Sequence, residues 1–379
     1  MYIPRAYEPL SKYLPRGKVL VLTGPRQVGK TTLVRRYLDH LDARTLYVLG
    51  DDVRAQATWS SMDLERLQSV VEGYHTVVID EAQRIPNVGI SLKLLVDARS
   101  PVRLIVTGSS SFDLAGQTGE PLTGRKRSLV LLPISQSELL PLHNRHELRE
   151  QLESRLVFGS YPEVEAAGSR EERIATLDEI TGSYLLKDIL ELDRIRSAKT
   201  LLDLLRLIAF QVGSEVSLRE LGTQVGLDSK TVARYLDLLE KGFVLYNVRG
   251  YSRNLRKEIT KKSKFYFYDN GIRNALIASF NGLELRDDVG ALWENFLFAE
   301  RLKHRTYNRI GGNAFFWRTW EGQEIDLVEE REGALYGYEF KWGERAARRR
   351  AGPPAGWRES YPHAHYEVIT PENYLDFVT

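Results

Sequence analysis

The sequence contains no cysteine, so no disulfide bond and no thiolate metal site can form. It also lacks any run of about 18 uninterrupted apolar residues, the length that a membrane-spanning helix needs. The first residues show neither the apolar stretch nor the small-residue cleavage site of a signal peptide. We therefore expect a cytoplasmic protein that has no membrane partner.

The net charge of the chain is also small. The 53 Lys and Arg residues nearly balance the 51 Asp and Glu residues, which leaves a formal charge of +2. Total charge therefore does not indicate a nucleic-acid partner, and such a partner must be argued from where the basic residues lie. The chain has 379 residues, too many for one compact core and suited to two or three domains.

Three patterns follow one another along the chain. Up to about residue 135, short apolar runs alternate with helical or polar stretches, which predicts βαβ units and a parallel sheet. From about 136 to 245 the apolar residues recur at helical spacing. Beyond about 264, short runs rich in aromatic residues predict strands again. These patterns indicate three parts.

A glycine-rich segment follows the predicted strand Lys18–Thr23 and precedes a helical pattern, the context in which G-x-x-x-x-G-K-T binds phosphates. Its glycines let backbone N–H groups surround the phosphates at a helix N-terminus. Lys30 is expected to reach the β- and γ-phosphates, and Thr31 to ligate Mg²⁺. The residues predicted to bind ATP are Gly24, Pro25, Arg26, Gln27, Val28, Gly29, Lys30, Thr31 and Thr32.

Two adjacent carboxylates, Asp80 and Glu81, end the apolar strand pattern Thr76–Glu81. Because side chains alternate along a strand, the two acids are expected to have separate tasks. Asp80 is predicted to orient Mg²⁺ through its water shell, and Glu81 to act as general base on the attacking water. A kinase usually needs only the first acid, so the pair favours ATP hydrolysis coupled to movement.

These motifs resemble those of the AAA+ superfamily, and more narrowly those of a group of prokaryotic ATPases marked by GPRQVGKTT, VxIDEAQR and TGSSS. The resemblance implies an α/β fold with a P-loop ATPase core over residues 1–135 and a helical lid over 136–200. It also implies a polar residue that senses the γ-phosphate, for which Ser109 is the first choice and Thr107 the second. Arg125 matches an arginine that precedes the last strand of the core.

Arg125 could act as a finger that stabilises charge on the γ-phosphoryl group in a neighbouring subunit. The active enzyme would then be a homo-oligomer, with a hexameric ring as one form. A solvated basic turn at Arg125–Arg127 is the open alternative.

Residues 201–264 are predicted to form a winged helix-turn-helix. Two helices are expected on either side of a tight turn at Gly226–Asp228, and a hairpin would supply the wing. Seven basic residues lie between 249 and 264 against one acid, Glu258: Arg249, Arg253, Arg256, Lys257, Lys261, Lys262 and Lys264. Such a density suits phosphate contact, although a protein-binding role and a merely solvated charge run stay open. The predicted DNA-contacting residues are Lys230, Arg234, Arg253, Arg256, Lys257, Lys261 and Lys262.

Acidic residues recur in the last third of the chain. Glu294 lies in an amphipathic helical pattern, Glu324 and Asp326 share one face of a predicted strand, and Glu339 and Lys341 share one face of the next. Carboxylates placed in this way can converge on one divalent cation, and a lysine beside it can hold the hydrolytic water.

This order of residues resembles the PD-(D/E)xK nuclease superfamily, which implies a nuclease-like α/β domain over residues 265–379. The resemblance implies Mg²⁺ or Mn²⁺ bound by Glu294, Asp326 and Glu339, with Asp326, Glu339 and Lys341 as catalytic residues. The basic segment Glu344–Arg350 is either a phosphate contact or a solvated helix end.

Three hypotheses follow from the sequence. The first is an AAA+ ATPase fused to a metal-dependent nuclease that acts on DNA as an oligomer. The second is a non-nucleolytic switch, in which ATP drives assembly and the C-terminal domain docks a protein or DNA partner. The third is a ring that threads polypeptide, against which the ATPase half shows no short aromatic-hydrophobic-glycine pore loop.

Overall fold

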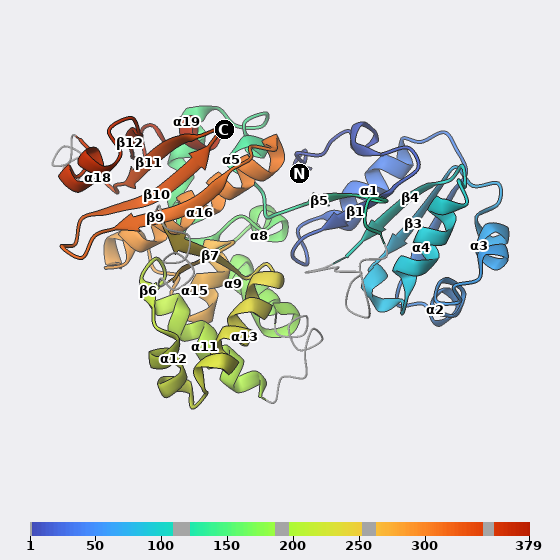
Figure 1. Cartoon of the computed structure of the whole chain (residues 1–379), viewed down its shortest axis with the longest axis horizontal. Coiled ribbons are helices and arrows are strands. Elements are labelled where there is room, and N and C mark those ends of the chain that lie inside the picture. Colours follow the sequence, from blue (N-terminus) through green and yellow to red (C-terminus); the bar gives the residue numbers. More distant parts are fainter. Residues whose placement is uncertain (1, 109–121, 186–196, 252–262, 344–351) are drawn as a thin grey trace. The chain divides into compact units, whose positions relative to one another are not determined.

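The computed structural model describes residues 2–108, 122–185, 197–251, 263–343 and 352–379. The chain divides into two compact units: Pro4–Leu132, and Pro133–Thr379 together with the first three residues (Figure 1). Among the described residues, none of the helices combines the length and the apolar content needed to cross a bilayer.

The unit Pro4–Leu132 is built on a five-stranded sheet in the order β2-β3-β4-β1-β5. All of its strand pairs are parallel, as the alternating sequence pattern predicted. Because β4 lies between β1 and β3, the ends of these three strands meet at one edge of the sheet. The strands are β1 (Val19–Thr23), β2 (Thr45–Leu49), β3 (Thr76–Asp80), β4 (Arg103–Thr107) and β5 (Lys126–Val130).

Helices cover this sheet, so its central strands are almost fully buried apolar runs. One core cluster joins Val19, Val77, Leu92 and Val106 from β1, β3, α4 and β4. Short 3-10 helices also lie at Leu10–Tyr13 and Ala82–Arg84. The helices are α1 (Lys30–Asp39), α2 (Val53–Trp59), α3 (Leu64–Val71) and α4 (Val88–Asp97).

The second unit begins with short helices. Three of them start at capping boxes, in which the N-cap side chain and a glutamate three residues later bond to each other's backbone N–H groups; the N-cap residues are Ser135, Asn144 and Ser169. The helices are α5 (Gln136–Leu139), α6 (Arg145–Glu150), α7 (Leu152–Phe158), α8 (Pro162–Ala166) and α9 (Arg170–Glu179), followed by a π-helix at Ile180–Leu185.

The middle of this unit has helices at both positions of the predicted helix-turn-helix. α12 (Leu218–Val225) ends at Gly226 in the left-handed conformation, and α13 (Ser229–Lys241) is capped by Asp228. α13 buries the apolar residues Val232, Tyr235, Leu236 and Leu239. The neighbouring elements are α11 (Ala198–Phe210), β6 (Glu215–Val216), β7 (Leu245–Gly250) and β8 (Ser263–Phe267).

A seven-stranded sheet in the order β12-β11-β10-β9-β7-β8-β6 runs through the rest of the unit. The hairpin β7–β8 therefore continues into the strands of the predicted nuclease-like part, through a parallel pairing of β7 with β9. Its remaining elements are α15 (Asn270–Leu276), a 3-10 helix (Leu283–Leu285), α16 (Val289–Asn308), β9 (Asn313–Arg318), β10 (Glu324–Arg331), β11 (Ala334–Phe340), α18 (Ala355–Ser360), β12 (His365–Ile369) and α19 (Tyr374–Val378).

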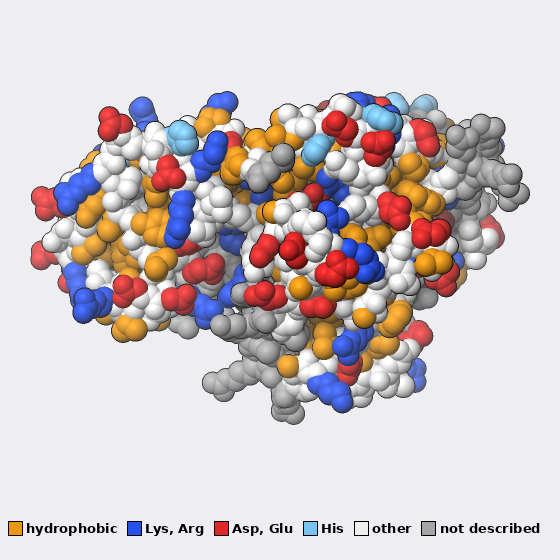
Figure 2. Space-filling view, turned by 180° about the vertical axis from the view of Figure 1, so that it is seen from behind, with side chains coloured by type: hydrophobic (Ala, Val, Ile, Leu, Met, Phe, Trp, Pro, Cys, Tyr) orange, Lys and Arg blue, Asp and Glu red, His pale blue; other side chains and the backbone are white. Residues whose placement is uncertain are grey.

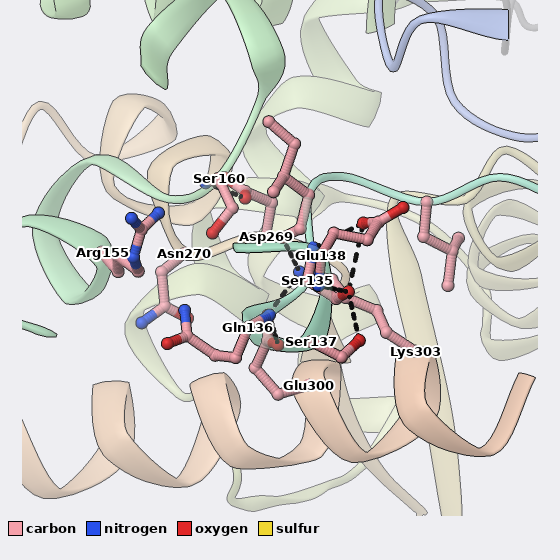
Figure 3. Close-up of polar contacts among 12 residues, drawn as sticks. Ser135, Gln136, Ser137, Glu138, Arg155, Ser160, Asp269, Asn270, Glu300 and Lys303 are labelled. Carbon is pink, nitrogen blue, oxygen red and sulfur yellow. Dashed lines mark hydrogen bonds and ion pairs between the residues drawn. The ribbon is translucent and has the colours of Figure 1, made fainter. Parts of the chain in front are cut away.

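A buried polar network joins the short helices to α15 and α16 (Figure 3). Glu300 on α16 accepts the backbone N–H of Gln136 at 2.7 Å and the ammonium of Lys303 at 2.6 Å. Asp269, the N-cap of α15, accepts the backbone N–H of Ser160 at 2.7 Å. The segment predicted as a lid thus belongs to the same compact unit as residues 201–379, and its action as a lid on the ATPase stays a prediction.

Candidate functional site

The glycine-rich loop closes around Lys30, the first residue of α1. The Lys30 ammonium donates to the carbonyls of Gly24 at 2.9 Å and Pro25 at 2.6 Å. Gly24 has φ 144, and a Cβ there would lie 1.9 Å from the Leu131 carbonyl oxygen, while Gly29 has φ 91. Only glycine fits these two positions, and the resulting turn suits a phosphate.

The remaining loop residues complete the turn between β1 and α1. Arg26 and Gln27 are partly buried, Val28 is fully buried, and Thr32 is exposed on α1. Arg5 supports the turn from outside, because its guanidinium donates to the carbonyls of Val28 and Leu132. The sequence analysis missed Arg5, since no local pattern links residues this far apart along the chain.

Asp80 is the centre of the site, at the end of β3. Thr31 on α1 donates to both of its carboxylate oxygens, at 3.0 and 3.3 Å. Thr107 at the end of β4 donates to one oxygen, and Tyr47 on β2 donates to the other. The fold thus brings Thr31 and Asp80, the two residues predicted to hold Mg²⁺, into direct contact.

Tyr47 was not predicted from the sequence, because nothing in the strand TLYVL marks a functional tyrosine. Burial and the adjacent Asp80 carboxylate raise the pKa of Tyr47, so its hydroxyl stays protonated and remains a hydrogen-bond donor. The only available clue was the pairing of neighbouring strands, since Tyr47 and Asp80 lie on β2 and β3.

Glu81 follows Asp80 in a left-handed backbone conformation, with φ 54 and ψ 44. Its backbone N–H donates to the Thr107 hydroxyl at 3.2 Å, and its side chain accepts from Gln83. Gly50 packs against it so closely that a Cβ at Gly50 would lie 2.2 Å from the Glu81 carbonyl oxygen. The two acids therefore occupy different environments, but because Glu81 lies beyond the end of β3, alternation along the strand is not the reason.

The remaining predicted residues of this unit are the γ-phosphate sensor, Ser109 or Thr107, and the arginine finger, Arg125. Ser109 lies outside the described residues, whereas Thr107, the second choice for the γ-phosphate sensor, is fully buried against Asp80. Arg125 precedes β5 at the sheet edge opposite the loop, since its carbonyl accepts from Val19 at the start of β1. Its guanidinium is partly exposed and pairs with Asp97 at 2.5 Å.

Of the predicted DNA-contacting residues, Lys230 and Arg234 are exposed on α13. Arg253, Arg256, Lys257, Lys261 and Lys262 lie outside the described residues, as does the basic segment Glu344–Arg350. Acidic and basic side chains are interspersed on the face that Figure 2 shows, in keeping with the small net charge.

Lys264 was counted in the basic density between residues 249 and 264, although it was not among the predicted DNA-contacting residues, and it does not belong to an exposed basic surface. Its side chain is 4% exposed and lies inside the protein, where the Nζ atom contacts Glu324 at 2.5 Å and Glu294 at 3.5 Å. A buried ammonium that is paired with two carboxylates does not reach a nucleic-acid backbone. The burial of Lys264 could not be predicted from the many basic residues around it in the sequence, because it depends on the strands that pack against β8.

Acidic residues of α16, β10 and β11 meet near Lys264. Burial raises the pKa of Asp326 well above its usual range, and the negative charges of Glu294 and Glu339 add to the effect. Asp326 accepts the backbone N–H of Phe340 at 2.7 Å, and Glu339 pairs with Lys341 at 2.6 Å. Glu294 and Glu339 thus lie near enough to Asp326 for their charges to act on it, and Glu324, which the sequence placed on the same strand face as Asp326, contacts Lys264.

Hard carboxylate oxygens of this kind are suitable ligands for Mg²⁺ or Mn²⁺. Glu294, however, accepts from the Tyr266 hydroxyl at 2.6 Å as well as facing Lys264. In the part of the chain that the structure describes, no group of three or more His, Cys, Asp or Glu residues is arranged so that it could hold a metal ion. The predicted metal ligands Glu294, Asp326 and Glu339 therefore stay a prediction.

Family models match three stretches of the chain. Residues 16–140 match the model of an AAA domain, which agrees with the parallel sheet, the glycine-rich loop and the Asp80 contacts described above. This stretch is an AAA domain with a P-loop. The AAA domain is followed by matches to two domains of unknown function, DUF8612 over residues 149–284 and DUF4143 over residues 289–371.

Similar proteins in two bacteria and one archaeon are named as uncharacterized proteins. Protein Rv2008c of Mycobacterium tuberculosis is 29% identical over 335 residues, which cover 88% of this chain and 72% of the relative. A Haemophilus influenzae protein is 25% identical over 337 residues, which cover 83% of this chain and 80% of the relative. Protein MJ1544 of Methanocaldococcus jannaschii is 22% identical, with 84% and 73% covered. The similarity extends well beyond the AAA domain.

Solved structures give weaker likenesses. The Holliday junction branch migration motor RuvB of Thermotoga maritima is 16% identical, with a TM-score of 0.29 over 60% of this chain and 81% of that one. A signal transduction ATPase with a tetratricopeptide repeat sensor from Pyrococcus horikoshii is 13% identical, with a TM-score of 0.26 over 82% and 48%. Both TM-scores are too low for either likeness to bear on the function.

Proposed function

We propose that this protein hydrolyses ATP in its AAA domain, acts on DNA as a homo-oligomer, and carries a metal-dependent nuclease in its C-terminal part. The observation that carries the ATPase part is the contact of Asp80 with Thr31 from α1 and Thr107 from β4. These hydrogen bonds join the helix that follows the phosphate-binding loop to Asp80 at the end of β3 and to Thr107 at the end of β4, the strand between β1 and β3.

Each residue of the AAA domain has a separate task in this proposal. Lys30 and the loop amides bind the phosphates, and Thr31 and Asp80 hold the Mg²⁺ of MgATP. Glu81 accepts the proton of the attacking water, while Thr107 fixes the backbone of Glu81 through the bond to its N–H group. Ser109 or Thr107 senses the γ-phosphate, and Arg125 reaches the site of a neighbouring subunit.

DNA dependence is tested by phosphate release from the full chain, with and without duplex DNA, over a range of salt concentrations. We expect DNA to raise the rate, and its effect to weaken steeply as salt increases, because phosphate contacts release counterions. Neutralising Arg256, Lys257, Lys261 and Lys262 together should reduce both effects. If the rate of phosphate release is the same with and without DNA at every salt concentration, the proposal that the protein acts on DNA is wrong.

For the nuclease part, Asp326 and Glu339 would hold a divalent cation, which supplies Lewis-acid stabilisation of the phosphoryl oxygens when bound. Lys341, already directed at Glu339, would position the hydrolytic water and stabilise negative charge. Glu294 would orient water or complete the ligand set.

The nuclease proposal is tested with linear, circular, single-stranded DNA and RNA substrates, each with and without Mg²⁺, Mn²⁺ and ATP. Wild type should cut at least one DNA substrate, Asp326→Ala should cut none, and Lys341→Ala should keep cation binding while losing most cleavage. Neither substitution should change ATP hydrolysis in the absence of DNA, because the two sites lie in separate units.

A non-nucleolytic switch is the second candidate. Its support is that the acids of the C-terminal cluster already have protein cations, Glu339 with Lys341 and Glu324 with Lys264. In that case ATP binding drives assembly, and the C-terminal part docks a protein or DNA partner. Absence of cleavage under every metal, combined with ATP-dependent change in oligomeric state, would favour the switch.

A further inference from the structure

A cavity of about 540 Å³ lies within the second unit, bordered by α13, β7, α16 and β9. Its lining includes Glu240 from α13, Asn247 from β7 and Arg305 from α16. In the described structure β7 pairs with β9 at only two positions, near the end of β7, and the preceding residues of β7 line the cavity instead. A space of this volume is large enough for a small molecule.

Arg305 carries a positive charge that the protein neutralises only in part. It lies 3.7 Å from the buried carboxylate of Glu329, which already accepts two hydrogen bonds from Arg301, at 2.9 and 2.8 Å. The same carboxylate also lies 3.2 Å from Arg331, so one acid faces three guanidinium groups. Another nitrogen of Arg305 donates to a backbone carbonyl just before β9 at 2.5 Å.

The buried Nε atom of Arg305 has no hydrogen-bond partner among the residues that the structure describes. Buried donors of this kind normally have an acceptor, and an ionised guanidinium prefers an anionic one. Arg249, exposed near the end of β7, lines the same cavity and adds a second positive charge. The cavity therefore suits an anionic group such as a phosphate.

Asn247 and Glu240 form another polar part of the lining. The Asn247 amide donates to Glu240 at 3.3 Å, whereas its buried Oδ1 atom accepts no hydrogen bond from any described residue. Burial raises the pKa of Glu240 to about 7, so near neutral pH its carboxyl group is present both with and without the proton. A carboxyl group beside an unused amide acceptor fits the edge of a nucleobase that has an amino group.

Two aromatic side chains, Tyr246 and Phe315, also line the cavity. Aromatic rings pack against the flat face of any base, so they complete a set of groups for a phosphate, a base edge and a base face. The two arginines alone would suit many anions. The unused acceptor of Asn247 and the aromatic rings together favour a nucleotide over a simple anion.

We propose that this cavity binds one nucleotide whose base carries an exocyclic amino group. Arg305 and Arg249 bind the phosphate, and Asn247 and Glu240 bind the edge of the base. The nucleotide is either free or the end of a DNA strand. This inference goes beyond the proposed function, because none of its residues belongs to the ATP site or to the C-terminal acids.

The experiment measures binding of AMP, GMP, CMP and UMP to the full chain by titration calorimetry. A Lys30→Ala background keeps the ATP site from contributing. We expect one site per chain for AMP, GMP and CMP, and about tenfold weaker binding of UMP, whose base offers no amino group to Asn247. The inference is wrong if none of the four binds, or if UMP binds as tightly as the others.

Two variants separate the phosphate from the base. Arg249→Met changes an exposed residue, so it should fold, weaken AMP binding by about fivefold and leave adenosine binding unchanged. Asn247→Leu should reduce the affinity for AMP to that for UMP. Arg219→Met is the matched control, since it removes an exposed arginine of α12 that does not line this cavity. Equal losses of AMP affinity in the two arginine variants would overturn the inference.

Competition distinguishes the two sources of the nucleotide. Short single-stranded DNA with adenine at both ends is added to the Lys30→Ala protein loaded with fluorescent AMP. Displacement by this strand, but not by the same strand ending in thymine, identifies a strand end as the ligand. If neither strand displaces AMP, the ligand is a free nucleotide. None of these measurements requires ATP hydrolysis or DNA cleavage, so failure of the proposed function would leave them unchanged.

Discussion

At the scale of single residues, the AAA domain concentrates hydrogen bonds on Asp80. Thr31, Thr107 and Tyr47 come from three different elements and all donate to the same carboxylate. A carboxylate held in this way has little freedom to turn, which suits a group that must orient a metal ion. Thr107 has a second task, because its hydroxyl also accepts the backbone N–H of Glu81.

Replacing Thr107 with valine keeps the branched shape and removes both hydrogen bonds. We expect ATP to bind almost as in wild type, and the rate of hydrolysis to fall by about tenfold to a hundredfold, because the Glu81 backbone loses its anchor. Phosphate release and titration with a fluorescent ATP analogue measure the two quantities. Thr107→Ser restores the hydroxyl and should recover most of the rate, whereas equal rates in the valine variant and wild type would contradict this role.

At the scale of elements, the turn between α7 and α8 docks on the N-terminus of α15. Asp269 caps α15 through the N–H groups of Gly271 and Ile272, and it also accepts the N–H of Ser160 (Figure 3). Gly159, with φ 74, lies so close that a Cβ there would be 1.9 Å from the Asp269 carboxylate. One buried carboxyl group thus joins two elements that are far apart in sequence.

Gly159→Ala should therefore destabilise the Pro133–Thr379 unit. The left-handed backbone and the clash with Asp269 together should lower the free energy of unfolding by about 2–4 kcal/mol. Urea denaturation followed by circular dichroism measures it. Gly168→Ala is the matched control, since a Cβ there meets only the Glu172 carboxylate at 3.5 Å. Equal losses in both variants would show that the docking turn is not the cause.

Asp269 also predicts a pH dependence. Burial raises its pKa to about 6, although the charge of Lys303 and the backbone N–H groups act in the opposite direction. The ordinary value is about 3.9, so the folded protein holds this proton more tightly than the unfolded chain. The contribution to stability is complete below about pH 4 and is lost as pH rises through about 6.

The free energy of unfolding of wild type relative to Asp269→Asn should therefore fall between about pH 4 and 6. The total change should reach about 3 kcal/mol. Urea denaturation of both proteins at several pH values gives this difference directly, because other titrating groups are shared. A difference that stays constant across this range would mean that Asp269 titrates normally.

At the scale of the whole molecule, the placement of Arg125 bears on assembly. Arg125 lies at the edge of the AAA sheet opposite the phosphate-binding loop of its own subunit. Under the proposed function, Arg125 would therefore act in the site of a neighbouring subunit. Its ion pair with Asp97 is partly exposed, so leaving that pair costs little.

Arg125→Ala should bind ATP normally and lose most hydrolysis. Mixing it with Lys30→Ala protein should restore part of the activity, because a mixed interface contains one intact loop and one intact arginine. Asp97→Asn removes the partner of Arg125 without removing the arginine and should keep hydrolysis. If mixing restores nothing at any ratio, Arg125 is a surface residue.

The sequence predicted those features whose residues lie close together along the chain. The glycine-rich loop, Asp80 and the five parallel strands were readable because their residues are adjacent in the chain. The roles of Tyr47 and Arg5 and the burial of Lys264 were not readable, because each contact joins segments that only the folded chain brings together. The acids Glu294, Asp326 and Glu339 were predicted to converge on a cation, which stays a prediction, whereas the contacts of Lys264 with Glu294 and Glu324 were not predicted.

Glu81→Gln is the most direct test of the account. The glutamine keeps the shape of Glu81 and cannot accept the proton of the attacking water. The variant should bind ATP as wild type does, measured by titration with labelled ATP, and hydrolyse it more slowly by orders of magnitude in single-turnover assays. Lys30→Ala should instead lose binding itself. Hydrolysis by Glu81→Gln at the wild-type rate would contradict the central claim that Glu81, beside Asp80, makes this AAA domain an ATPase.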